Sequence, residues 1–166
     1  MKQDIQDRYE ALFAAHAQKL AQERAAKAAK EIREDEFERL FQHCCDTSIS
    51  SAFEQLGEYL RTKGLKTRVE QTRERRGRDG TMQHQKAITL RLLVGDDERH
   101  YPEYEQPHLS LVCDKGRQLI DVIENTTTLQ SSGHTNAVAS VKIEQLTDEF
   151  LQQKVLLLLQ EVLGQD

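Results

Sequence analysis

The segment from Pro107 to Asn125 constrains the fold most, because it has the pattern of a β-hairpin. Apolar residues alternate with smaller or polar ones over 108–113, which places one set of side chains on each face of a strand. Residues 114–117, Asp-Lys-Gly-Arg, supply a turn, since Asp can accept hydrogen bonds from the turn backbone and Gly can take a positive φ. The stretch 119–124 is rich in β-branched residues and predicts the returning strand. We therefore expect an antiparallel sheet.

Three further segments extend this hairpin to a meander of about five strands. The patterns of Lys66–Thr72 and Gln83–Val94 predict strands before the hairpin, and Ala137–Ile143 predicts one after it. Residues 73–80, with four arginines and two glycines, are expected to form a loop, and so are the Ser- and Thr-rich residues 126–136. The order of these segments predicts that consecutive strands are neighbours in one sheet.

The last segment predicts a C-terminal helix packed on one face of the sheet. Thr147 is a good N-cap, acidic residues follow it in the first turn, and Gly164 ends the helix. Val155 to Leu159 are five apolar residues in succession, so this helix is apolar nearly all round. We expect it to be buried on more than one side, against the sheet and against either the helix at 37–63 or a second subunit.

The first 45 residues predict one long helix. Nine of the nineteen residues from Ala11 to Ala29 are Ala, and neither Pro nor Gly occurs before Gly57. A kink or a new helix start is expected near Asp46, where Asp-Thr-Ser could cap a second helix, and that helix should end before Gly64. Large apolar residues recur at helical spacing near the N-terminus. They are Ile5, Tyr9, Leu12, Phe13 and Leu20.

This helix has two interpretations. It can be an association helix, which buries the apolar positions against a second copy or another protein. It can equally be a solvated helix, stabilised by charge pairs one turn apart. The whole pattern predicts an α+β fold, with an extended Ala-rich helical arm at 1–35 and a compact domain at 36–166.

Composition and charge exclude few classes of function. Of the 166 residues, 31% are charged and 37% hydrophobic, and the net charge of −5 argues weakly against bulk nucleic-acid binding. The sequence contains neither a run of about 18 apolar residues that could span a membrane nor the apolar core of a signal peptide. The three cysteines fit reduced thiols, and we expect a cytoplasmic protein without membrane contact.

No motif in the sequence predicts an enzyme, a cofactor or a metal site. The chain has no Gly-x-Ser-x-Gly elbow, no Gly-rich phosphate loop and no dinucleotide fingerprint. Its six histidines lack metal-ligand spacing, and ordinary surface histidines explain them most simply. An enzyme would need a convergent site on the sheet, lined by His84, His100 and His134.

The basic segment 61–78 is the strongest local charge feature. Its candidate contacts for an anion or a nucleic acid are Arg73, Arg75, Arg76 and Arg78. No aromatic residue lies between Leu60 and Ala87, so the stacking platform typical of single-stranded nucleic-acid binding is missing. A solvated loop is the simpler interpretation.

These observations give three functional hypotheses. The first is a non-enzymatic module for protein interaction or self-association, in which the N-terminal helix binds a second copy or another protein. The second is binding of a nucleic acid or a phospholigand through the basic segment. The third is an enzyme with the histidine site.

Overall fold

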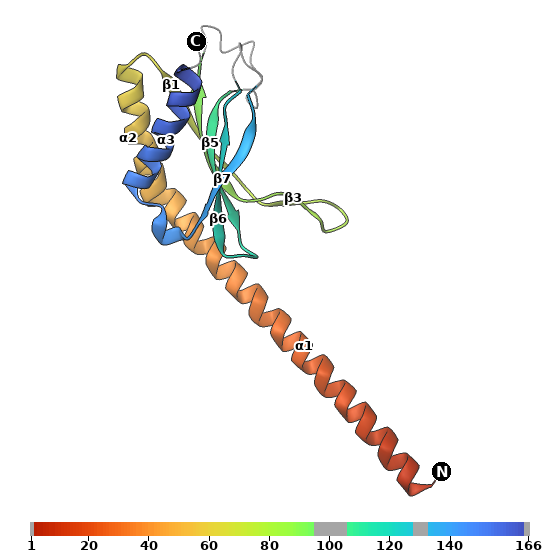
Figure 1. Cartoon of the computed structure of the whole chain (residues 1–166). Coiled ribbons are helices and arrows are strands. Elements are labelled where there is room, and N and C mark those ends of the chain that lie inside the picture. The colour runs from red at the N-terminus through yellow and green to blue at the C-terminus, as the bar shows by residue number, and fades with distance from the viewer. Residues whose placement is uncertain (1, 95–105, 128–132, 165–166) are drawn as a thin grey trace. The chain divides into compact units, whose positions relative to one another are not determined.

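The computed structural model describes residues 2–94, 106–127 and 133–164 of the chain. The chain divides into two compact units, Met1–Glu36 and Phe37–Asp166. The structure confirms the expected α+β fold, with a long N-terminal helix, a five-stranded antiparallel sheet and a C-terminal helix on the sheet (Figure 1). None of the helices in the described ranges is long and apolar enough to cross a membrane.

The first unit is one stretch of solvated helix. It belongs to α1, which runs over 42 residues from Gln3 to Cys44. Contacts one turn apart support it locally: the Gln3 amide donates to Asp7 at 2.9 Å, and Lys30 lies 3.8 Å from Glu34. Ala and long straight side chains favour the helical conformation without tertiary contacts.

A π-helical turn, η1 (Cys45–Ile49), joins α1 to α2 (Ser50–Thr62). The prediction that Asp46, Thr47 and Ser48 cap a new helix is therefore wrong. The hydroxyl of Thr47 instead donates to the His43 carbonyl at 2.7 Å, and the Ser48 hydroxyl donates to the Cys44 carbonyl at 3.4 Å. Short hydroxyl side chains within a helix commonly bond to the preceding turn in this way.

The wide turn keeps one face of the helix towards the core. Phe41, Cys45, Ile49 and Phe53 succeed one another at intervals of four residues, and all four are fully buried. Residues four apart in a regular α-helix drift by about 40° around the axis. The π turn holds an extra residue and offsets this drift.

Helix α2 ends before Gly64, as predicted, and its end has Schellman geometry. The Leu65 amide donates to the Leu60 carbonyl at 3.0 Å, the Gly64 amide donates to Arg61 at 3.0 Å, and Gly64 has a φ of +84°. Gly57, in the middle of α2, has a different role. A Cβ there would lie 2.6 Å from the Thr67 hydroxyl, so glycine lets the helix approach the first strand.

The main sheet has the strand order β1-β4-β5-β6-β7, and all neighbours are antiparallel. The strands are β1 (Lys66–Thr72), β4 (Ala87–Leu93), β5 (His108–Asp114), β6 (Leu119–Asn125) and β7 (Thr135–Val141). The hairpin of β5 and β6 and the strand at Lys66–Thr72 are as predicted, but the positive φ of the hairpin turn belongs to Gln118 (54°) and not to Gly116. Of the expected loop at 126–136, residues 128–132 lie outside the described residues.

Three boundaries differ from the predictions. The second predicted strand starts at Ala87 rather than Gln83. The expected loop at 73–80 contains a short strand, β2 (Arg75–Arg76), which pairs with β3 (Met82–His84) as a separate ribbon. The last strand ends at Val141, because Ile143 begins the 3-10 helix η3 (Ile143–Gln145).

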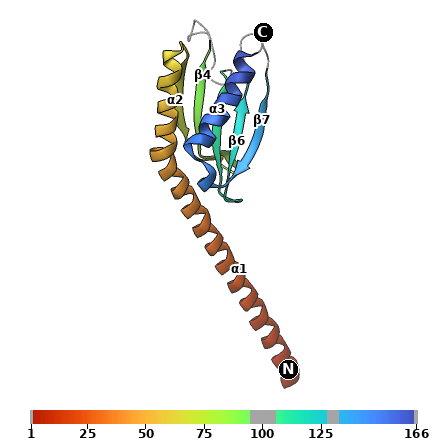
Figure 2. The same cartoon turned by 60° about the vertical axis from the view of Figure 1, so that its left-hand side comes forward.

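Two helices cover one face of the sheet, and the core lies beneath them (Figure 2). Apolar side chains from alternate positions of the three central strands fill this face and are at most 4% exposed. They are Ile88, Leu90, Leu92, Leu109, Leu111, Cys113, Ile120 and Val122. Burial of each large side chain contributes roughly 1.5–3 kcal/mol, so this layer is the main source of stability.

Helix α3 (Asp148–Leu163) begins as predicted, with the Phe150 amide donating to the Thr147 hydroxyl at 3.2 Å. It packs on the sheet and on α2 through Leu151, Val155 and Leu158. However, Leu156 and Leu157 are 49% and 41% exposed. The expected packing against both the sheet and the helix at 37–63 is therefore confirmed, whereas the side of α3 that carries Leu156 and Leu157 is exposed in the single chain.

Candidate functional site

The five predicted apolar positions near the N-terminus lie on one face of α1 and are exposed. Phe13 and Leu12 are 67% and 66% exposed, and Tyr9 is 55% exposed. This apolar patch, which we call the α1 stripe, runs from Ile5 to Leu20 and consists of Ile5, Tyr9, Leu12, Phe13 and Leu20. At 1.5 Å per residue the stripe is about 24 Å long. Beyond Leu20 the same side of the helix carries Glu23 and Lys27, so the stripe ends there.

Arg75, Arg76 and Arg78 belong to the β2–β3 ribbon, which extends away from the main sheet in Figure 1, and Arg73 lies at its base, between β1 and β2. Its turn is ordered: the Gly77 amide donates to the Thr81 carbonyl at 2.8 Å, and Gly80 has a φ of +81°. Asp79 accepts bonds from the Thr81 amide and hydroxyl at 3.1 and 2.6 Å. These bonds lower the pKa of Asp79 and hold its charge within the turn.

The four arginines of the ribbon have different surroundings. Arg76 lies 3.0 Å from Glu74 and donates to the Gly80 carbonyl at 3.4 Å, so its guanidinium supports the turn. Within the described ranges, Arg73, Arg75 and Arg78 have no carboxylate within 4.0 Å. Three cationic side chains of the ribbon are thus available to an anion.

A charge network anchors the base of the ribbon. Lys115 Nζ lies 2.8 Å from Glu74 and 3.5 Å from Glu38, and Lys86 lies 3.4 Å from Glu38. The hydrogen bond from Lys115 is the main reason why the pKa of Glu74 is lowered. Glu74 is thereby neutralised locally, and it subtracts little from the positive charge of the three arginines. No sequence pattern indicated this network, because its members come from distant segments.

The opposite face of the sheet carries a polar cluster. Arg91 Nε donates to Glu70 at 2.9 Å, and the Thr89 and Ser110 hydroxyls share a buried hydrogen bond at 2.7 Å. His108 Nδ1 lies 2.9 Å from the Gln106 carbonyl, and burial lowers the pKa of His108. The polar groups of this cluster thus form hydrogen bonds with one another. Such pairs between neighbouring strands typically stabilise a sheet.

The structure describes two of the three predicted histidines, His84 and His134, and they belong to different parts of the chain's two sheets. His84 is exposed in β3 near the start of β4, whereas His134 is exposed beside β7, at the far edge of the sheet. His100 lies outside the described residues, so the histidine site remains a prediction. Among the described side chains, no group of three or more His, Cys, Asp or Glu could hold a metal ion.

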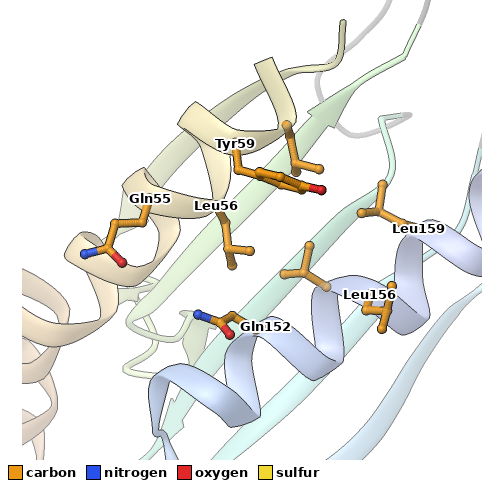
Figure 3. A pocket seen from close by; sticks show the side chains of 8 residues that line it. Gln55, Leu56, Tyr59, Gln152, Leu156 and Leu159 are labelled. Carbon is orange, nitrogen blue, oxygen red and sulfur yellow. The ribbon is translucent and has the colours of Figure 1, made fainter. Parts of the chain in front are cut away.

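A groove between α2 and α3 is a feature that the sequence hypotheses missed. It encloses about 420 Å³ and is lined by Gln55, Leu56, Tyr59, Leu60, Gln152, Val155, Leu156 and Leu159 (Figure 3). Tyr59 is 60% exposed although it lines an apolar space. The run Val155–Leu159 was a partial signal, because it holds more apolar residues than one buried face needs.

Comparison with known proteins finds no family model, no curated protein and no solved structure that matches this chain.

Proposed function

We propose that the protein is an interaction module that associates with a second copy of itself through the α1 stripe. The observation that supports this is the exposure of five large apolar side chains on one face of a solvated helix. Soluble chains rarely leave such a row of side chains in water, and contiguous apolar patches are typical of interaction sites. The charged residues on the same side beyond Leu20 limit the contact to a defined length.

Burial of the stripe can offset the cost of association. Burial of a large apolar side chain contributes roughly 1.5–3 kcal/mol, so the stripe offers on the order of 10 kcal/mol. This is comparable to the roughly 4–15 kcal/mol that association costs in lost freedom. The helix is already formed, so little further conformational entropy is lost on binding.

The test is the mass of the full chain in solution, measured by light scattering on a sizing column. We expect the native chain to be a dimer and the double variant Leu12→Gln, Phe13→Gln to be a monomer. The matched control is Ile32→Gln, because Ile32 is 57% exposed on α1 but lies on another side of the helix. A double variant with the mass of the native chain would contradict the proposal.

A second candidate function, binding of a nucleic acid or phospholigand, is favoured by the β2–β3 ribbon. A two-stranded ribbon fits the major groove of duplex DNA, and three of its arginines lack an acidic partner among the described residues. Binding to a labelled duplex, followed by fluorescence anisotropy, should fall steeply as salt is raised.

The variant for this test is Arg73→Gln, Arg75→Gln, Arg78→Gln, which spares Arg76 because Arg76 supports the turn. We expect weaker binding and a salt slope reduced by roughly 0.9 for each phosphate that the variant no longer neutralises. The control removes three cations from α1, through Lys19→Gln, Arg24→Gln and Lys27→Gln. Equal affinity of the ribbon variant and the native chain would exclude the ribbon as the binding surface.

A further inference from the structure

We propose that the groove between α2 and α3 is the receptor for the α1 stripe of a second copy, so that two chains exchange their helices reciprocally. This inference rests on the proposed self-association and names the surface that the stripe contacts. Each chain carries one exposed apolar helix face and one apolar groove, and the residues that the structure describes leave both surfaces open.

The groove has the shape and lining that a helix face needs. The volume of the groove is about 420 Å³, and pockets that bind drug-sized ligands have volumes of roughly 300–1,000 Å³. The lining is aliphatic apart from Tyr59 and two glutamines, and Leu156 at its side is half-exposed. Amphipathic helices bind such grooves through anchors one turn apart.

The α1 stripe supplies anchors of this kind. Tyr9 and Phe13 are four residues apart and therefore project from the same side of the helix, one turn from each other. A buried tyrosine hydroxyl needs a hydrogen-bond partner. The side-chain amides of Gln55 and Gln152 lie at one end of the groove and can supply it (Figure 3).

The area that would be buried argues against pairing of one stripe with another. The stripe has two aromatic and three aliphatic side chains, each exposed by 39–67%, which amounts to on the order of 500 Å². Two stripes packed together would bury about 1,000 Å² in total, below the roughly 1,200–2,000 Å² of stable interfaces. Two stripes placed in two grooves would also cover Tyr59 and Leu156 of each groove, which are 60% and 49% exposed, and the total would reach the lower part of this range.

The proposed dimer has two-fold symmetry, so that both contacts form at once. When the stripe of one copy occupies the groove of its partner, a two-fold axis places the partner's stripe in the first groove. The dimer is then closed, and neither the stripe nor the groove is left to recruit a third chain. A closed dimer with two equal contacts is therefore the expected assembly.

The test uses full-length chains with one surface altered in each. The stripe variant is Leu12→Gln, Phe13→Gln, and the groove variant is Tyr59→Gln, Leu156→Gln. Both groove positions are about half-exposed, so these changes leave the core intact, as circular dichroism should verify. The control is Leu157→Gln, next to Leu156 on α3 but outside the groove lining.

We expect the native chain and the control to be dimers, and each variant alone to be a monomer. An equimolar mixture of the two variants should form a heterodimer, because the intact stripe of one fits the intact groove of the other. This heterodimer keeps one of two contacts, so its dissociation constant should be raised at least roughly tenfold over that of the native dimer.

Other outcomes separate this inference from the proposed function. If the groove variant is a dimer while the stripe variant is a monomer, the stripe pairs with another surface, and only the groove proposal is overturned. If the native chain is a monomer at every concentration, or if both variants remain dimers, both proposals are overturned.

Discussion

Leu157 and Leu158 are consecutive in α3, yet the structure predicts very different costs for truncating them. Leu158 is fully buried between the helix and the sheet, whereas Leu157 is 41% exposed. Leu158→Ala should lower the free energy of unfolding by about 3 kcal/mol, because it removes buried methyl groups and leaves a cavity. Leu157→Ala should cost about 1 kcal/mol or less, since no enclosed cavity forms and Ala favours the helix.

The assay is urea unfolding followed by far-UV circular dichroism, with the thermal midpoint as a second readout. For a chain of this size, 3 kcal/mol corresponds to a decrease in Tm of about 6–12 °C. Both substitutions are made in the Leu12→Gln, Phe13→Gln background, so that association does not add to the stability. Equal costs at the two positions would refute the conclusion that Leu157 lies on an exposed side of α3.

Three further predictions concern thiols, pH and the α3 cap. Burial raises the pKa of Cys45 and of Cys113 to about 12, so neither should react with a thiol reagent at pH 8 before the chain is unfolded in urea. Rapid modification of Cys113 in the native protein would contradict this. Burial lowers the pKa of His108. As pH falls through about 6.5, the imidazole is therefore protonated in the unfolded chain before it is protonated in the folded chain. Stability should therefore decrease from pH 7.5 to 5.5, and His108→Gln should flatten the dependence of the urea midpoint on pH over this range; an unchanged slope would refute the assignment. Thr147→Ala should cost about 1 kcal/mol of unfolding free energy in the same urea assay, whereas Thr147→Ser should restore most of it; equal stability of the two variants would argue against the cap.

The fold was predictable wherever local chemistry and tertiary packing agree. The β5–β6 hairpin has strict alternation and a suitable turn, and α3 has a clear N-cap, so both elements were found from the sequence. The β2–β3 ribbon was missed because its strands are two and three residues long and exposed at every position, and therefore carry no apolar alternation. The start of β4 was placed too early because Gln85 and Lys86 continue the polar pattern of the ribbon, whereas Lys86 pairs with Glu38 instead.

The candidate sites were predictable only in part, for a different reason. The α1 stripe is a periodic pattern within one helix, so its five residues could be named from the sequence alone. The α2–α3 groove combines residues about a hundred positions apart, and no local pattern indicates which exposed leucines of α3 face α2. Arg76 differs in role from the other arginines of the ribbon because it donates a hydrogen bond to the Gly80 carbonyl. Composition alone does not show this difference.

The π turn at Cys45–Ile49 also bears on how chain length can vary in this protein. A helix that loses one residue normally rotates everything before the deletion by about 100° around its axis. Phe41 and Ile49 are eight residues apart and both fully buried; after loss of the exposed Thr47 they would be seven apart, which in a regular α-helix changes their alignment by only about 20°. The wide turn thus holds a spare residue, and single-residue deletions should be tolerated within it, although they would misalign the core elsewhere in α2.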